Sequence, residues 1–380
     1  MKSLLTLGKY DYNILFPIIS GIASFFIYFI FFMLIKPKII EFPIILNFGS
    51  SISMCLSLFL FIIYKYENGK CRITKNLIND KVDKKKEKKR KYISKYLFIL
   101  LCSLFDFSET LLINMFCKDV KINLWFFDII FFSLFSYLLF GTKIYLHHYI
   151  SIFFTILIGI TLDILMDHYN NMLIDMHLKI IKLITEIILS FDVALTKYSM
   201  ETYFISPYEF CFYMGVIQLI LNSLLFLISH YIKFLNIFLM DLDGFKLKDL
   251  LLYTVFIFMK FIYNLCNLLT VKNTTECHFL IIIIFGELAN YMNDFMEFKK
   301  GNKSKIIIII TSLGFCLIFF MTLIFIEIVE LNFFGLQLNT KKNIAKRAVL
   351  EDEILDDLNE SICSEGGYLI NMENIDEENN

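Results

Sequence analysis

The sequence is short of charge, of proline and of the motifs that mark catalytic sites. Only 19% of its 380 residues are charged and only four are proline, whereas 57% are hydrophobic and 43 are phenylalanine. A soluble protein averages roughly 45–50% apolar residues. The composition therefore excludes a soluble enzyme, and it equally excludes a disordered protein. The nine cysteines show no paired spacing of the zinc or disulfide kind, which excludes a secreted disulfide scaffold.

The few charges gather in short segments, and between these run apolar stretches of about 18–24 residues, which is long enough to cross a bilayer as a helix. We therefore predict an all-α polytopic membrane protein with about ten transmembrane helices. The predicted spans are 14–35, 43–64, 96–116, 122–141, 146–166, 179–197, 210–231, 250–271, 278–296 and 305–329.

The most basic segment, 65–95, indicates the topology. Its run Lys84–Lys91 lies between the second and third spans, and such clusters stay on the cytoplasmic side. This places the N-terminus (1–13) and the acidic tail (331–380), which we expect to be disordered, in the cytoplasm. The lysines of 297–305 then fall outside, against the rule. We expect a multi-pass protein of a eukaryotic endomembrane or plasma membrane, with Lys84–Lys91 able to contact anionic lipid.

The ten spans divide evenly into two halves, 14–166 and 179–330, joined by the linker 167–178. Because each half has five spans, the second half enters the membrane in the opposite orientation. This is the geometry of inverted-repeat transporters, which bind their substrate near the membrane midplane between the halves. We therefore predict two inverted five-helix repeats.

Ionisable and polar side chains inside the spans are the candidate functional residues, because a charge at mid-bilayer costs about 2.5–3.5 kcal/mol on insertion scales. Lys260, Asn264 and Asn267 follow i, i+4, i+7 spacing and form a stripe on one helix face. The candidates also have a structural interpretation, as interhelical hydrogen bonds or as an ion pair of Lys260 with a carboxylate. The predicted cavity lining is Asp106, Glu109, Asp128, Lys260, Tyr263, Asn264, Asn267, Glu287 and Asn290.

Three further expectations follow from helical geometry and from missing motifs. Glu186 and Asp192 are six residues apart and should not share one helix face. His147 and His148 are adjacent, so on a helix they should diverge by about 100° and not chelate together. No sequence pattern for a metal site, a phosphate loop or a nucleophile is present, so we predict no enzyme activity and no cofactor.

The order of residues in several spans resembles the drug/metabolite transporter superfamily, in particular its EamA-like and nucleotide-sugar-transporter-like solute carriers. The resemblance covers most of 95–330 at the level of pattern. It implies ten helices, alternating access and a central substrate site, while Asp128 stands where relatives often carry an amide or a basic residue. The segments that carry it are Cys102–Leu112, Trp125–Asp128, Leu139–Tyr149 with Gly159, Glu186–Gly215, and Tyr263-Asn264 with 276–291.

The expected function is transport of a small polar or anionic metabolite, such as a nucleotide sugar, across a lipid bilayer. Lys260 would meet a negative group of this small-molecule substrate, and a buried carboxylate could carry a coupling proton. The alternative is a non-transporting membrane scaffold or receptor that uses the basic segment and the acidic tail for docking. No nucleic-acid partner is expected, and the sequence leaves the oligomeric state open.

Overall fold

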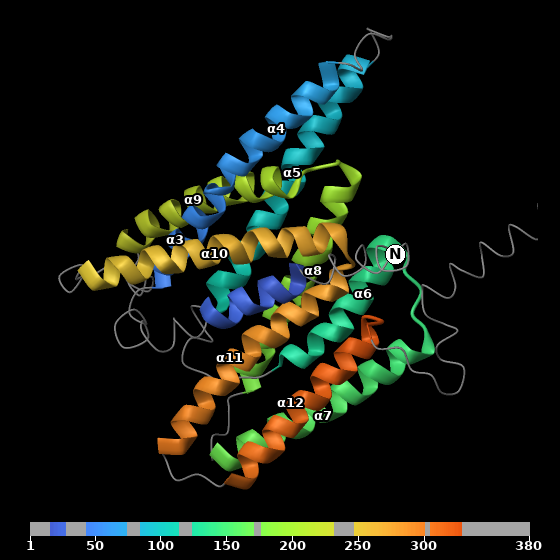
Figure 1. The fold of residues 1–380 in the computed structure, drawn as a ribbon, viewed down its shortest axis with the longest axis vertical. Helices are drawn as coiled ribbons and strands as arrows, with labels where there is room; N and C mark the ends of the chain where they lie inside the picture. The colour runs from blue at the N-terminus through green and yellow to red at the C-terminus, as the bar shows by residue number, and fades with distance from the viewer. Residues whose placement is uncertain are drawn as a thin grey trace, which may run out of the picture. The chain divides into compact units, whose positions relative to one another are not determined.

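The structure, a computed structural model, describes residues 16–27, 43–73, 84–113, 124–170, 176–231, 247–300 and 305–328. Within these ranges the chain is helical and contains no strand (Figure 1). The predicted N-terminal segment 1–13 and the tail 331–380 lie outside the described residues, as do the side chains of Lys84–Lys91. Their predicted disorder, sidedness and lipid contact stay predictions.

Each of the ten predicted spans overlaps one or two of the described helices. In chain order these are Phe16–Ile27, α3 (Pro43–Cys55), α4 (Ser57–Ile73), α5 (Lys84–Leu112), η3 (Trp125–Phe127), α6 (Asp128–Phe140), α7 (Leu146–Asn170), α8 (Met176–Thr202), α9 (Pro207–Tyr231), α10 (Leu247–Asn273), η5 (Glu276–His278), α11 (Phe279–Lys300) and α12 (Lys305–Phe325).

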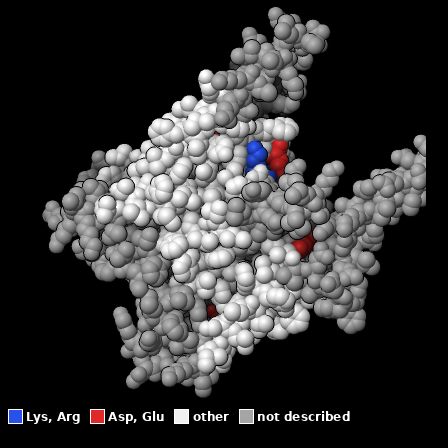
Figure 2. All heavy atoms as spheres, in the orientation of Figure 1, with Lys and Arg blue, Asp and Glu red and all other residues white. Residues whose placement is uncertain are grey.

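Within the described ranges, four helical segments are long and apolar enough to cross a membrane, namely Leu46–Tyr66, Leu146–Leu165, Pro207–Ile228 and Tyr253–Asn273. Three more, within Phe16–Ile27, Trp125–Phe140 and Ile309–Phe325, are apolar but shorter. On the face drawn in Figure 2 the described surface is almost entirely uncharged. The molecule therefore fits a multi-pass membrane protein.

Proline and glycine mark helix ends where their backbone chemistry requires it. Pro43 and Pro207 are the first residues of α3 and α9, where a missing N–H leaves no hydrogen bond unmade. α9 begins at Pro207, three residues before the predicted span 210–231. Gly141 ends α6 in the left-handed region at φ +64°, and its N–H bonds to the carbonyl oxygen of Tyr137.

The central helices pack closely through small residues. α3 packs against both α9 and α10, α5 packs against α8 and α9, and α6 packs against α8. At Gly215 on α9, an added Cβ would lie only 2.6 Å from the Cβ of Met54 on α3. A larger residue at this position would push the two helices apart, so glycine sets their separation.

The chain forms two compact units. The first comprises Met1–Lys143 and Ile152–Thr322, and the second comprises Ile144–Ser151 and Leu323–Asn380. In the second unit the structure describes the turn that begins α7 and the residues that follow α12, up to Ile328. The predicted division into halves at 14–166 and 179–330 is not tested by these units and stays a prediction.

Candidate functional site

A polar cavity of about 430 Å³ lies within the first unit, between the helix Phe16–Ile27 and helices α3, α5, α8, α9, α10 and α11. Its walls combine side chains from both halves of the sequence. Seven of the nine predicted residues line it, namely Asp106, Glu109, Lys260, Tyr263, Asn264, Asn267 and Glu287. The structure thus brings candidates on α5 together with candidates on α10 and α11, which are distant from α5 in sequence.

Of the remaining two predicted residues, one lies elsewhere and the other has a side chain outside the described residues. Asp128, the first residue of α6, is fully buried but does not line the cavity. Its Oδ1 accepts a long hydrogen bond of 3.5 Å from the hydroxyl of Ser190 on α8. Asp128 therefore joins α6 to α8, behind the cavity wall. Asn290 lies on α11, and its side chain is outside the described residues.

The α5 wall carries two carboxylates one helical turn apart. Asp106 and Glu109 both face the cavity, as their spacing of three residues predicts. Asp106 accepts a hydrogen bond from the side-chain amide of Gln218 on α9. This bond orients one carboxylate and ties α5 to the opposite half of the sequence.

The α8 wall carries three charged side chains. Lys182 forms an ion pair of 2.5 Å with Glu186 one turn later, and Asp192 lies further along the same helix. Glu186 and Asp192 both line the cavity, although their spacing of six residues places them on different faces of the helix. Since α8 packs against α5, α6 and α10, more than one of its faces is enclosed. Asp192 is 7% exposed, and its Oδ1 has no hydrogen-bond partner among the described residues.

The α10 wall contributes two amides that bond to other helices. The Nδ2 of Asn264 donates to the hydroxyl of Ser53 on α3 at 3.1 Å, and Asn267 accepts a hydrogen bond from the Ser20 hydroxyl. Lys260 makes no ion pair with the described carboxylates, contrary to one expectation. Its Nζ instead lies 4.5 Å from the centroid of the Tyr263 ring, a cation–π contact.

The formal charges of the cavity are mainly acidic. Five carboxylates face two lysines: Asp106, Glu109, Glu186, Asp192 and Glu287 against Lys182 and Lys260. Sequence reasoning missed Lys182 because it lies close to the start of its predicted span. The spacing of Lys182 and Glu186, i and i+4, was the available signal, because such residues are neighbours on a helix.

Outside the cavity, a buried ion pair fastens three elements of the first unit together. The Nζ of Lys197 on α8 lies 3.2 Å from Oε2 of Glu276 in η5. The hydroxyl of Ser136 on α6 donates to Oε1 of the same carboxylate. Glu276 is only 2% exposed, and these partners neutralise it and satisfy its oxygens. We interpret this group as structural.

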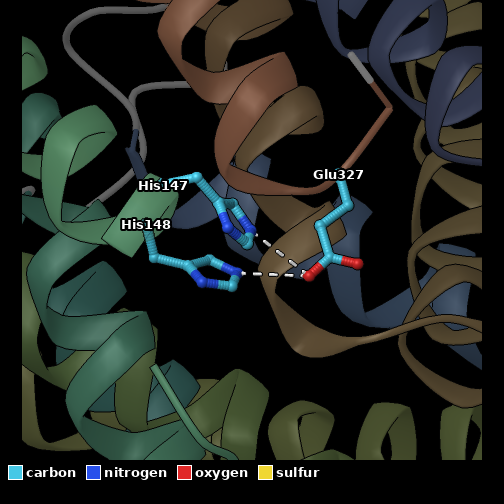
Figure 3. A group of neighbouring side chains, drawn as sticks. All are labelled: His147, His148 and Glu327. Carbon is cyan, nitrogen blue, oxygen red and sulfur yellow. Dashed lines mark ion pairs between the residues drawn. The ribbon is translucent and has the colours of Figure 1, made fainter. Parts of the chain in front are cut away.

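In the second unit, two histidines and a carboxylate come together (Figure 3). The Nε2 atoms of His147 and His148 lie 3.4 Å and 3.6 Å from Oε1 of Glu327. The two imidazole ring centroids are 4.0 Å apart. The expectation that the two rings diverge is therefore wrong. Their side chains extend from the first turn of α7, where rotation about χ1 and χ2 turns both rings toward one carboxylate.

Comparison with known proteins leaves the resemblance noted above as a prediction. No protein-family model matches the chain, and no curated protein sequence matches it.

Proposed function

We propose that this chain is a membrane transporter that moves a small polar solute by alternating access between its two five-helix halves. The observation that carries the proposal is the cavity of about 430 Å³, whose lining includes charged and amide side chains from both halves. A buried polar cavity between apolar helices is costly to maintain, and such sites in membrane proteins mark substrate or ion pathways.

Helix contacts support a relation between the halves. In the proposed repeat, α3 is the counterpart of α9, and α5 is the counterpart of α10. The contact between α3 and α10 therefore corresponds to the contact between α9 and α5, and both contacts occur. The helix Phe16–Ile27 is the counterpart of α8. The contact of α5 with α8 therefore corresponds to the hydrogen bond from Ser20 on that helix to Asn267 on α10. Since α6 is the counterpart of α11, the contact of α6 with α8 corresponds to the close approach of Gly21 on the helix Phe16–Ile27 to Phe285 on α11.

Local structure adds a second correspondence. The 3₁₀ turn η3 leads directly into α6, and the 3₁₀ turn η5 leads directly into α11. These are the fourth and ninth predicted spans, which are counterparts in the proposed repeat. Inverted repeats with a substrate site at their interface are a recurring architecture of secondary transporters. Membership of the drug/metabolite transporter superfamily, with its ten spans, remains part of this proposal.

The charge of the cavity bears on the solute. Five carboxylates against two lysines favour a solute with a cationic or hydrogen-bond-donating group over a purely anionic metabolite, because an anion would meet more repulsion than attraction. An anionic group, such as the phosphates of a nucleotide sugar, would depend on Lys260, which has no competing ion pair among the described residues. A zwitterionic solute would pair its cationic group with the carboxylates and its anionic group with Lys260.

Reconstitution into liposomes tests the proposal. Proteoliposomes incubated with a cell metabolite extract are washed, and their contents are identified by mass spectrometry against protein-free liposomes. We expect one or a few small polar solutes to accumulate, and Lys260→Ala to change their uptake. The matched control is Lys95→Ala, which removes a lysine that pairs with Glu209 outside the cavity.

The outcome separates the transporter from the alternative of a scaffold or receptor. Accumulation that is equal in wild-type protein and in Lys260→Ala removes Lys260 from the site but leaves transport intact. Absence of any accumulated solute, from protein that is folded and correctly inserted, contradicts transport itself.

A further inference from the structure

We propose that His147, His148 and Glu327 form a binding site for a divalent transition-metal ion, with Zn²⁺ as the simplest occupant. The site lies within the second unit and shares no residue with the proposed solute cavity. It does not depend on the proposed transport function. The ion would join the segment Ile144–Ser151 to the segment that follows α12.

The spacing of the candidate ligand atoms suits a single ion. In a tetrahedral zinc site with bonds of about 2.0–2.1 Å, neighbouring ligand atoms are about 3.3 Å apart. The distances from Oε1 of Glu327 to the two imidazole Nε2 atoms are 3.4 Å and 3.6 Å. One ligand atom from each of the three residues lies within 4.8 Å of the other two. Small side-chain adjustments would complete the shell.

Burial supplies a second, independent observation. His147 is 3% exposed, and neither of its ring nitrogens has a hydrogen-bond partner among the described residues. A buried polar atom without a partner is unfavourable, and such groups in native structures are expected to have a specific explanation. Figure 3 shows the His147 ring directed toward the carboxylate of Glu327. A metal ion between them would satisfy one of these nitrogens.

The backbone presents Glu327 from a tight turn. Glu327 adopts φ +61°, a left-handed conformation that is uncommon for residues other than glycine. Its N–H donates to the carbonyl oxygen of Ile324, and the N–H of Ile328 donates to the carbonyl oxygen of Leu323. These bonds hold the turn that follows α12, so the carboxylate is presented from a fixed backbone position.

His148 must change its tautomer to serve as a ligand. Its Nδ1 accepts a hydrogen bond of 3.1 Å from the backbone N–H of Tyr145, so the proton of the neutral ring lies on Nε2. Metal binding at Nε2 requires that this proton move to Nδ1 and that the Tyr145 contact open. Tyr145 belongs to the non-helical segment before α7, where a small local shift is available.

The donor set selects the class of ion. Two imidazole nitrogens and one carboxylate oxygen suit Zn²⁺ and its neighbours Co²⁺, Ni²⁺ and Fe²⁺, whereas Ca²⁺ and Mg²⁺ prefer shells made wholly of oxygen. Three protein ligands leave a fourth position for water. The carboxylate also offsets one of the two positive charges of the ion.

The test uses the purified full-length protein in detergent, with an affinity tag that contains no histidine. Co²⁺ is titrated first, because its visible d–d absorption reports the coordination geometry and the type of ligand atoms around the ion. Zn²⁺ is then added as a competitor. We expect one Co²⁺ per chain, a tetrahedral N/O spectrum, and displacement by Zn²⁺. We also expect Zn²⁺ to raise the midpoint of thermal unfolding.

The variants are His147→Ala and Glu327→Gln, with His177→Ala as the control that removes an exposed imidazole on α8. Loss of an outer-shell partner typically weakens metal affinity by about 10–100-fold, and loss of a ligand should cost at least as much. We therefore expect both site variants to bind at least about tenfold more weakly, and the control to bind as the wild type does.

Glu327→Gln preserves side-chain size, so it keeps the test valid if His147→Ala fails to fold. An unfolded variant is recognised by size-exclusion chromatography and circular dichroism. Unchanged affinity in folded Glu327→Gln overturns the proposal. Intense cobalt–thiolate absorption, which would place the ion on cysteines, overturns it as well, and so does the absence of binding to the wild-type protein.

Discussion

The α10 wall and the α8 wall of the cavity hold their polar groups in different ways. On α10, Asn264 and Asn267 are bonded to serine hydroxyls of other helices. On α8, Lys182 and Glu186 pair within the same helix, and one oxygen of Asp192 has no partner among the described residues. The amides therefore connect helices, whereas the charges are held within one helix and face the cavity.

This difference separates structural from functional polarity. An amide buried between helices contributes modestly to their association and costs little to bury when it is bonded. A charged group within a membrane is costly at any position, so it is expected to face a cavity or a partner. We infer that the α10 amides hold the cavity in shape and that the α8 charges act on its contents. Three predictions test this inference.

The largest effect is expected from breaking the α8 ion pair. Lys182→Met leaves Glu186, which is 4% exposed, without its partner at 2.5 Å. Removing one member of a buried pair costs about 3–5 kcal/mol. Because the Lys182 side chain is 19% exposed, we expect about 3 kcal/mol, the low end of that range. Denaturant unfolding in detergent measures the free energy of unfolding.

The double variant Lys182→Met with Glu186→Gln is the matched control, because it removes both charges and leaves neither unpaired. We expect it to recover most of the lost stability. If the double variant is as unstable as the single variant, the loss comes from packing of the lysine stem and the interpretation of the α8 wall is wrong.

A smaller effect is expected at the α10 wall. Asn264→Ala removes the bond to Ser53, but the Ser53 hydroxyl still donates to the carbonyl oxygen of Ser50. Interhelical hydrogen bonds in membrane proteins average about 0.6 kcal/mol in double-mutant cycles. We expect a coupling energy of about 0.6 kcal/mol between Asn264→Ala and Ser53→Ala, measured from unfolding free energies in a double-mutant cycle. A coupling near zero would mean that the bond does not hold α10 against α3.

The apolar pattern predicted the helices well because helix formation and membrane burial both follow from long apolar runs. The ends were less predictable. α5 begins at Lys84 rather than near 96, because lysine, arginine and glutamate are good helix formers outside the membrane too. Lys260, Asn264 and Asn267 of the predicted stripe all line the cavity.

The partners of these polar residues could not be predicted, because periodicity gives the face of a helix and not the neighbour opposite that face. Lys260 was expected beside a carboxylate and lies over Tyr263. Asp192 was expected on a different face from Glu186, and both can line the cavity because α8 is enclosed on several sides. His147 and His148 show the same limit, since side-chain rotation at a helix start overrides the angle between adjacent positions.

The smallest effect on stability, and the one that most sharpens the comparison, is expected for Asp192→Asn. Oδ1 of Asp192 loses no hydrogen bond to a described residue, and the amide has nearly the same size and carries no charge to bury, so the free energy of unfolding should not fall. Solute uptake should nevertheless fall by about tenfold or more, because a hydrogen bond to a charged group contributes about 1.5–3 kcal/mol.

The matched control for that prediction is Asp163→Asn in the C-terminal half of α7. This variant removes a carboxylate that pairs with Lys179 at 2.7 Å and does not line the cavity. We expect its uptake to stay close to that of the wild type. Should Asp192→Asn retain both wild-type stability and wild-type uptake, the carboxylate faces the cavity without contacting the solute. The α8 wall would then differ from the α10 wall in its chemistry but not in its role.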